Sequence, residues 1–392
     1  MNKSLKVTAI TVAAIALLVI AFAGGAVFDH AVLQPDAPTW GSGALKSTVG
    51  EVYEIIQREA LSPSDDASMT AGAVNGMLMS LDDPYANYFD AKHFEYFNEE
   101  AAGEFHGIGV TITSRENDLV IVSVIEGTPA ERAGLKADDV IVEIDGQTRP
   151  KWDSDEAVTL IRGEEGTTVT LGIRRGDSEE IKDYTITRAK IQVPNVDSEL
   201  LEDDIGYVRL YSFNERAEED LKKALEELED EGAKGFILDL RDNPGGLLSE
   251  SADVASLFVE DGVIVTVEDR EGTVEEYRAS GKTTTDAPLV VLVNGDSASA
   301  SEIVAGALQD HARAKLVGET TFGKGSVQQI EELSAGGAIK LTIAKYVLPK
   351  GRTIDKTGLT PDFEVPMEFE LQADKDSDTQ LKKAIEVLKD EL

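Results

Sequence analysis

The amino-acid sequence predicts an α/β protein with a small inserted domain and an N-terminal helical region. Three changes of pattern along the 392 residues indicate this organisation. Apolar residues recur at helical spacing within 45–104, short strands with glycine turns follow within 105–190, and strands alternate with helices within 191–392. Alternation of strands and helices is typical of layered α/β domains.

The first thirty residues differ in character from the rest of the chain. Lys3 and Lys6 precede a run from Val7 to Phe28 that is apolar or small apart from two threonines. The run is about long enough to span a bilayer, and the lysines before it indicate that the following chain lies outside the cytoplasm. We interpret residues 1–30 as an uncleaved signal anchor or a cleaved signal peptide, and we prefer the anchor. Residues 31–44, with proline, glycine and serine, are interpreted as a linker.

The chain is strongly acidic, with 74 Asp and Glu against 37 Lys and Arg and a net charge of -37. Nucleic-acid phosphates would be repelled, so we exclude nucleic acid as a partner. The charge is compatible with a well-solvated surface and equally with a high-salt habitat, where repulsion is screened. The chain has no cysteine, which excludes disulfides and thiolate chemistry.

The helical region and the small domain contain recognisable elements in chain order. The helical region has two helical stretches, then a turn at Asp82–Tyr85 and an aromatic-rich segment. In the small domain, glycine turns separate short apolar runs, which predicts strands. The expected strands are Val110–Thr113, Leu119–Val124, Asp138–Asp145 and Thr167–Arg175, and the expected helices are Thr128–Leu135 and Ser154–Arg162.

The α/β region is expected to alternate buried strands with amphipathic helices. The helix at 215–231 has an apolar stripe at three- and four-residue spacing, which indicates that one face packs on a core. The expected strands are Gly206–Tyr211, Gly235–Leu240, Leu289–Val293 and Ile339–Val347, and the expected helices are Glu215–Glu231, Leu247–Phe258, Glu302–Asp310 and Asp378–Leu392.

Ser299 is the candidate nucleophile of a catalytic site. It lies between an apolar strand and the helix that begins near Glu302. A helix N-terminus supplies N–H groups that stabilise a developing oxyanion, but a serine hydroxyl needs a nearby base to become nucleophilic. Ser299 and Glu302 also fit a capping box, so helix capping is the competing interpretation.

Lys324 is the candidate general base. It stands between two glycines, and its neighbours from Phe322 to Val327 include no acid. A lysine must lose its proton before it can act as a base, which requires burial away from carboxylates. A solvated surface lysine is the competing interpretation.

A second glycine turn supplies candidate oxyanion donors. Residues 239–246 read DLRDNPGG, so a strand ends in Pro-Gly-Gly directly before a helix. Free amides at such a helix entrance can bind developing negative charge, although a plain strand–turn–helix connection shows the same pattern.

Gly107, Ile108, Gly109 and Val110 form a candidate peptide-binding turn. A glycine-rich turn before a strand can hold a terminal carboxylate on backbone N–H groups, while the edge of the strand pairs with the peptide. Any other β-turn before a strand would look similar in sequence.

Other catalytic chemistries find less support in the sequence. His311 lies toward the far end of the Ser299 helix, which makes a Ser–His–Asp triad through it the weaker alternative. No HExxH, phosphate-binding or dinucleotide-binding motif is present, so we predict neither a metal nor another cofactor.

Together these stretches resemble one family, the carboxy-terminal processing (tail-specific) serine proteases. The resemblance covers nearly all of the chain after the N-terminal segment. It implies a PDZ domain that binds protein C-termini and a Clp/crotonase-like α/β protease core. The matching motifs are LDDPYANYF at 81–89, GIGVTI at 107–112, EGTPAERAGLKADDVIVEIDG at 126–146, LIRGEEGT at 160–167, LDLRDNPGG at 238–246, VNGDSASASEIVAGALQD at 293–310, GETTFGKGSVQ at 318–328 and GRTIDKTGLTPD at 351–362.

The resemblance implies a catalytic role for five residues. Ser299 would be the nucleophile, Lys324 the general base and Gln328 a residue that orients the lysine. The backbone N–H groups of Gly245 and Ala300 would form the oxyanion hole.

The resemblance also implies a peptide site in the PDZ domain. Gly107 to Val110 would bind the C-terminus of the peptide. Arg162 would help to couple peptide binding to alignment of the protease core. Val110 stands where other PDZ domains often have an aromatic residue.

We therefore expect a serine endopeptidase that cleaves protein C-terminal regions outside the cytoplasm through a Ser–Lys dyad. Its expected partners are protein or peptide substrates and, through residues 1–30, a membrane. A homo-oligomer is compatible with the sequence. Two alternatives belong to other classes: a PDZ scaffold without catalysis, and a crotonase-like acyl-CoA enzyme, which the acidic composition disfavours.

Overall fold

The computed structural model describes residues 43–115, 118–176, 178, 180–272, 274–366 and 377–392. The chain divides into two compact units with the boundary between residues 74 and 75. The predicted signal segment, 1–30, and nearly all of the predicted linker, 31–44, lie outside the described residues. Among the helices in the described ranges, none combines the length and the apolar character needed to cross a membrane.

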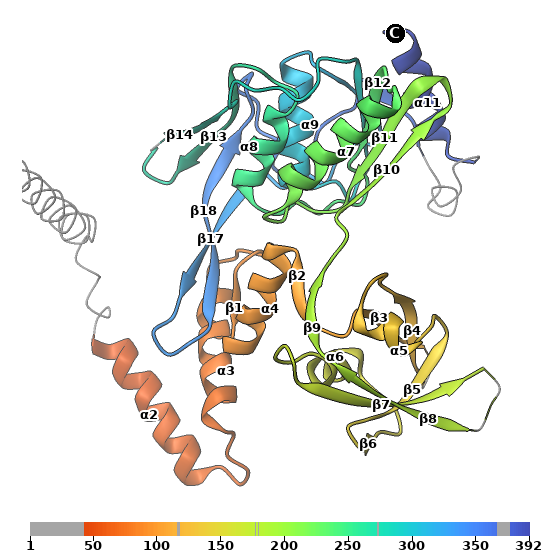
Figure 1. The fold of residues 1–392 in the computed structure, drawn as a ribbon. Coiled ribbons are helices and arrows are strands. Elements are labelled where there is room, and N and C mark those ends of the chain that lie inside the picture. Colours follow the sequence, from red (N-terminus) through yellow and green to blue (C-terminus); the bar gives the residue numbers. More distant parts are fainter. Residues whose placement is uncertain (1–42, 116–117, 177, 179, 273, 367–376) are drawn as a thin grey trace, which may run out of the picture. The chain divides into compact units, whose positions relative to one another are not determined.

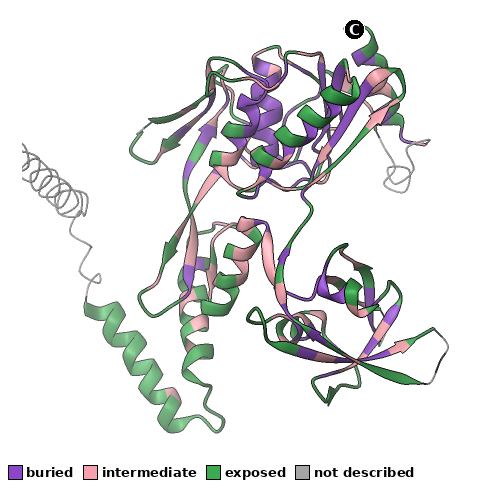
Figure 2. Cartoon of the chain, in the orientation of Figure 1, coloured by how far each residue is buried: buried purple, intermediate pink, exposed green. Residues whose placement is uncertain are grey.

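The described part of the first unit contains helix α2 (Gly43–Glu59) and most of helix α3 (Asp66–Met79). Tyr53 of α2 donates a hydrogen bond of 2.8 Å to the Asp66 carboxylate at the start of α3. No residue of α2 is buried, although its apolar residues recur at helical spacing (Figure 2). The exposed apolar stripe of α2 consists of Leu45, Val49, Val52 and Ile55, which are 42–50% exposed.

In the second unit, one five-stranded antiparallel sheet joins segments from opposite ends of the sequence. Strand β1 (Asn87–Phe89) pairs with β18 (Ala338–Val347), and helix α4 (Ala91–Ala102) follows β1 directly. The sequence pattern predicts no strand before residue 105, because a three-residue strand is too short to reveal an alternating pattern. The other strands are β13 (Val263–Asp269), β14 (Val274–Arg278) and β17 (Ser326–Glu332).

The small inserted domain has its own antiparallel sheet, in the order β3-β4-β5-β7-β8, and its own buried core. Its two ends come together because β2 (Glu104–Gly107) pairs with β9 (Ala189–Gln192). The sequence missed β2, β8 and β9, whose apolar alternation is weak. The elements are β3 (Val110–Arg115), β4 (Asp118–Val124), α5 (Pro129–Ala133), β5 (Asp139–Ile144), β6 (Gln147–Thr148), α6 (Ser154–Ile161), β7 (Thr168–Arg175) and β8 (Ile181–Thr187).

The rest of the second unit is an α/β core around a six-stranded sheet, in the order β10-β11-β12-β15-β16-β19. Within this sheet, β11, β12, β15, β16 and β19 pair in parallel, and only the edge strand β10 is antiparallel. Helices α7, α8 and α9 cover one face and α11 covers the other (Figure 1), which confirms the predicted α/β class. The elements are β10 (Val196–Leu201), β11 (Ile205–Leu210), α7 (Ala217–Glu231), β12 (Gly235–Asp239), α8 (Leu248–Ser256), β15 (Leu289–Val293), α9 (Ala300–Asp310), β16 (Lys315–Gly318), β19 (Phe363–Glu364) and α11 (Thr379–Lys389).

The sheet order determines where a site can form. Strands β12 and β15 are fully buried parallel neighbours, so the loops that follow their carboxyl ends lie side by side. These loops are the two glycine- and serine-rich segments that the sequence singled out. Asp242 and Asn294 join them, because the Asn294 side chain donates to Asp242 Oδ1 at 2.7 Å and accepts from the Asp242 N–H at 3.0 Å.

A buried ion network holds α11 onto the carboxyl end of β12. Arg241, only 2% exposed, contacts Asp239 at 2.6 Å and Asp378, the N-cap of α11, at 2.8 Å. Tyr207 donates a hydrogen bond of 2.7 Å to Asp239. Every charge in this network is therefore paired away from water.

Arg241→Met is expected to lower the free energy of unfolding by about 3–5 kcal/mol, because it leaves two buried carboxylates without their cation. Urea unfolding followed by circular dichroism measures the loss. The control is Arg278→Met, which removes an ion pair whose arginine is 52% exposed, and it should cost under about 1 kcal/mol. Equal losses in the two variants would contradict the role given to Arg241.

Candidate active site

Ser299 occupies a strained turn between β15 and α9. It is the N-cap residue of α9, and its backbone has φ 56° and ψ -114°, a combination that L-residues rarely adopt. Such strain occurs where a tight strand-to-helix turn exposes a nucleophile. Ser299 is half-buried and lines a cavity of about 560 Å³.

The two neighbouring serines have structural contacts that distinguish them from Ser299. Ser297 Oγ donates to Leu240 O and Ser301 Oγ donates to Asn243 O, each at 2.8 Å. Both side chains are fully buried. They hold the Ser299 turn against the turn that follows β12, so the alternating serines combine one candidate nucleophile with two structural side chains.

The predicted oxyanion donors lie next to each other. Gly245 has φ 100°, and a Cβ at this position would lie 2.8 Å from Ser299 Cβ and 2.9 Å from Ala300 N, so only glycine fits. Ala300 is the first residue of α9, and its N–H has no carbonyl partner within the helix. The Gly245 N–H donates to Asn243 Oδ1 at 2.9 Å, so it would have to exchange this bond to receive an oxyanion.

Glu302 connects the Ser299 turn to the Lys324 loop. Its carboxylate is fully buried, and Oε2 accepts the backbone N–H groups of both Ser299 and Lys324, each at 2.9 Å. Oε1 accepts from Thr321 Oγ1 at 2.5 Å and from the Gly323 N–H at 2.8 Å. The Ser299 contact is the glutamate half of the predicted capping box. The sequence did not reveal the other three contacts, because they are tertiary.

Lys324 lies in an environment that disfavours its charge. Burial lowers the pKa of its ammonium below the ordinary value, and the charge of Lys340 lowers it further. The carboxylates of Glu302 and Asp83 act in the opposite direction. The lowered pKa agrees with the burial expected of a general base. The two carboxylates were not expected near Lys324, because they come from other segments of the chain.

Lys324 Nζ lies 4.9 Å from the centre of the Tyr85 ring. Within the described ranges it makes no hydrogen bond or ion pair, so it is not bonded to Ser299 Oγ here. Contacts of this kind often tighten only when substrate binds. Tyr85 and Asp83 belong to the 81–89 motif, whose sequence predicts a turn at Asp82–Tyr85 but gives no sign of a contact with Lys324.

Gln328 lies on β17 and lines the same cavity as Ser299. Its side-chain Nε2 donates to Ser326 Oγ at 2.8 Å and contacts Thr342 Oγ1 at 3.4 Å. For Gln328 to orient Lys324, its side-chain amide would therefore have to rotate toward Lys324 Nζ.

The cavity contains all five predicted catalytic residues. The rest of its lining includes apolar side chains from α4, β17, β18 and the core, together with Glu100, Lys340 and other polar residues. No described histidine lines it, and His311 Nε2 is instead 2.8 Å from Val263 O, which argues against the Ser–His–Asp alternative. No cluster of three or more potential metal ligands occurs in the described part of the chain.

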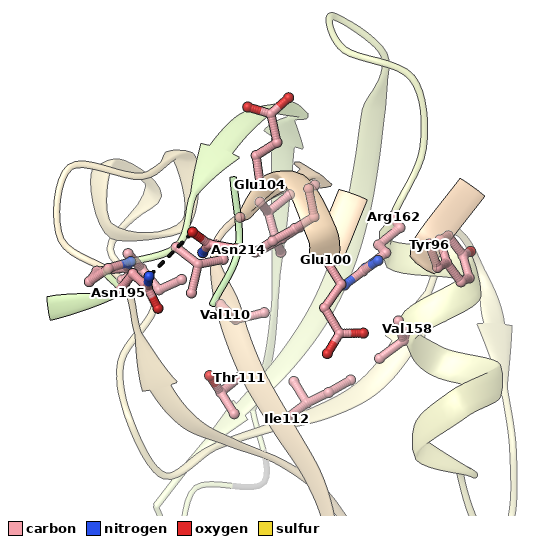
Figure 3. A pocket seen from close by; sticks show the side chains of 18 of the residues that line it. Tyr96, Glu100, Glu104, Val110, Thr111, Ile112, Val158, Arg162, Asn195 and Asn214 are labelled. Atoms are coloured by element: carbon pink, nitrogen blue, oxygen red, sulfur yellow. Dashed lines mark hydrogen bonds between the residues drawn. The ribbon is translucent and has the colours of Figure 1, made fainter. Parts of the chain in front are cut away.

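A second cavity, of about 610 Å³, lies along the glycine turn of the small domain (Figure 3). Strand β3 forms one wall, with Val110, Thr111 and Ile112, and Val158 of α6 belongs to the other. Strand β3 is an edge strand whose one neighbour is β4, so its free edge can accept a further strand. Gly107 to Val110, the candidate peptide-binding turn, all line this groove.

Arg162 ends helix α6 and also lines the groove. Its guanidinium pairs with Glu99 of α4 at 3.0 Å and lies 4.8 Å and 4.9 Å from the ring centres of Tyr96 and Phe105. Glu99 also accepts from the His106 N–H at 3.0 Å. Arg162 thus links the small domain to α4, the helix whose Phe97 and Glu100 line the Ser299 cavity.

Three protein-family models match parts of the chain. The model of peptidase family S41 matches residues 204–365, a PDZ-domain model matches 120–175, and a model described as the activating protease CtpB N-terminal domain matches 34–93. A solved structure from Bacteroides fragilis described as an S41 protease has the same fold, with a TM-score of 0.52 at 16% identity over 80% of this chain and 88% of that chain.

Two curated relatives identify the family. The carboxy-terminal processing protease CtpA of Bacillus subtilis is 40% identical over 80% of this chain and 67% of its own length. The carboxy-terminal-processing protease of Bartonella bacilliformis is 42% identical over 81% of this chain and 74% of its own length. Both are proteases, which sets aside the acyl-CoA enzyme and the non-catalytic scaffold. The chain therefore belongs to the carboxy-terminal processing proteases of peptidase family S41, and it is a serine-type peptidase that carries a PDZ domain.

Proposed function

We propose that this protein is an exported endopeptidase that captures the C-terminus of a protein substrate and cleaves its C-terminal region with a Ser299–Lys324 dyad. One observation carries the proposal. Ser299, Lys324, Gln328 and the turn at Gly245 line a single cavity, although they come from three separate segments of the chain.

The proposed reaction begins with attack of Ser299 Oγ on the scissile carbonyl. Neutral Lys324 takes the hydroxyl proton and later gives it to the leaving amine. The N–H groups of Ala300 and Gly245 stabilise the oxyanion, and water then hydrolyses the acyl-enzyme. The lowered pKa of Lys324 supports the role of base, because a larger fraction of the side chain is neutral near pH 7.

Capture of the substrate tail is assigned to the groove beside β3. We propose a PDZ domain within 105–190, between an N-terminal helical region within 45–104 and a protease core within 191–392. The pairing of β2 with β9 supports an insertion closed at its base. A peptide that added to the free edge of β3 would direct its carboxylate to the turn at Gly107 to Val110.

A pair of peptides tests tail recognition. Peptides of identical sequence with a free or an amidated C-terminus are expected to differ about tenfold or more in kcat/KM, because amidation removes the terminal charge that the glycine turn binds. Cleavage is measured by mass spectrometry, with Ser299→Ala as the inactive control. Equal cleavage of both peptides would contradict tail recognition, and no cleavage of any peptide or denatured protein would contradict the proteolytic function itself.

Two further partners are proposed from the N-terminal region. The apolar run within 1–30 supports export and membrane attachment. The exposed apolar stripe of α2 supports association between copies of this chain, because a helix with an unburied apolar face gains stability when that face is covered.

A further inference from the structure

A second lysine lines the Ser299 cavity. Lys340 lies on β18, where it is paired with Asn87 of β1 on one side and Ile330 of β17 on the other. Residues directly opposite each other in a sheet share a face, and all three of these residues line the cavity. The row therefore directs the Lys340 side chain toward the cavity that contains Ser299 and Lys324.

The charge of Lys340 is not neutralised by an acid. Lys340 is half-buried, its Nζ lies 5.7 Å from the centre of the Phe89 ring, and it forms no ion pair within the described residues. Acidic residues outnumber basic ones two to one in the whole chain, so an unpaired cation inside a cavity is unexpected. An uncompensated charge in a partly enclosed site acts on its neighbours more strongly than the same charge at an open surface.

Several carboxylates lie around Lys324, and the charge of Lys340 opposes their effect on its pKa. Glu302 from α9 and Asp83 from the turn before β1 both favour a protonated Lys324. Asp355 is close to Gly325, since a Cβ on Gly325 would lie 2.8 Å from Asp355 Cβ, and Glu100 of α4 lines the cavity. Two uncharged phenols, Tyr85 and Tyr346, complete the surroundings, and the pKa of each is raised by burial and nearby carboxylates.

This arrangement presents a conflict. Glu302 holds the Ser299 turn and the Lys324 loop together through its hydrogen bonds, yet its negative charge favours protonation of Lys324. A general base must be neutral when substrate arrives. A second positive charge that faces the same cavity destabilises the protonated base without disturbing the Glu302 contacts.

We propose that Lys340 is a positioning residue of the proteolytic reaction, and that its ammonium in the Ser299 cavity disfavours protonation of Lys324. The inference rests on the proposed Ser299–Lys324 dyad. Lys340 contacts neither the hydroxyl nor the scissile carbonyl in this role, and it acts through the electrostatic potential at Lys324 Nζ.

The sign of the effect follows from the charges. Activity requires neutral Lys324, so kcat/KM rises with pH through the pKa of this group. Removing the Lys340 charge raises that pKa, which moves the acid limb of the pH profile to higher pH. Above the limb, where Lys324 is neutral in both proteins, the plateau is unchanged.

The experiment compares pH profiles of kcat/KM for the full chain and three variants at constant ionic strength. Lys340→Met keeps most of the length and the apolar character of the lysine stem without its charge, and Lys340→Arg keeps the charge. Lys223→Met removes a lysine of α7 whose side chain is 73% exposed. At the pH where the unmodified protein has half its maximal activity, Lys340→Met is expected to lose about threefold or more. Lys340→Arg and Lys223→Met should superimpose on the unmodified profile.

Three outcomes would overturn the proposal. The acid limb of Lys340→Met could coincide with that of the unmodified protein, or Lys340→Arg could shift like Lys340→Met. A rise in KM confined to substrates with an acidic residue near the cleavage site, with no shift of the limb, would make Lys340 a substrate-binding residue instead. Thermal unfolding checks that each variant is folded.

Lys324→Ala, assayed in parallel, separates this inference from the function on which it rests. If Lys324→Ala retains activity, the dyad itself is wrong. If Lys324→Ala is inactive and the limb of Lys340→Met does not move, the dyad stands and only the role of Lys340 fails.

Discussion

Ser299→Ala and Lys324→Ala are each expected to lower kcat by about 10³-fold or more while the protein remains folded. Neither adjacent serine can replace Ser299, because Ser297 and Ser301 are buried and donate to backbone carbonyls. No described histidine lines the cavity to replace Lys324. Hydrolysis of a fluorogenic peptide gives kcat, and urea unfolding gives the free energy of unfolding.

Two further substitutions make this test specific. Lys324→Arg keeps the positive charge but cannot lose its proton near neutral pH, so it should be as inactive as Lys324→Ala. Ser299→Gly should be inactive yet more stable by about 1 kcal/mol, because glycine adopts the backbone angles at 299 without strain. Activity in Lys324→Arg would show that the charge of Lys324 matters rather than its basicity. A loss of stability in Ser299→Gly would contradict the strain.

The sequence predicts a helix or strand best when the pattern that indicates it lies within one short segment. Strand β15 was predicted with its observed bounds, and helix α5 lies within the predicted Thr128–Leu135 and is capped by Gly134, which has φ 86°. Periodicity, a run of apolar residues or a turn glycine is enough in such cases. Strands β1 and β8 were missed, because β1 is very short and β8 is mostly exposed, so neither shows an apolar alternation.

The candidate active site was harder to predict than the secondary structure, because its contacts join distant segments of the chain. The local pattern fits Ser299 either as a nucleophile or as a helix cap, and the roles of Ser299 and Lys324 came from resemblance to a family. Glu302 was recognised as a capping residue because that pairing spans three positions. Its contacts with Thr321, Gly323 and Lys324 cross about twenty positions, and they exist only because β15 and β16 are neighbours in the sheet. Lys340 reaches the cavity through pairing of β18 with β1, which no local pattern records.

Glu302→Gln is expected to lower kcat/KM by about 10²-fold or more and the free energy of unfolding by about 2–4 kcal/mol. Four donors point at the two carboxylate oxygens of Glu302, and one of these oxygens bonds the N–H groups of both Ser299 and Lys324. Glutamine has one acceptor oxygen, and its NH₂ group would face donors. The Ser299 turn and the Lys324 loop would therefore separate, and a shift of about 1 Å at a catalytic group is enough for a loss of this size.

The pH profile separates this positional role from an electrostatic one. Glu302 favours the protonated form of Lys324, so its removal lowers the pKa of Lys324 and moves the acid limb of the residual activity to lower pH. If charge were the main contribution of Glu302, Glu302→Gln would be more active than the unmodified protein at acidic pH. The positional role predicts lower activity at every pH, together with the displaced limb.

The control is Glu332→Gln, at an exposed residue that ends β17, which should change neither activity nor stability. Activity above that of the unmodified protein at low pH would show that a nearby carboxylate hinders the base more than its hydrogen bonds help to position it.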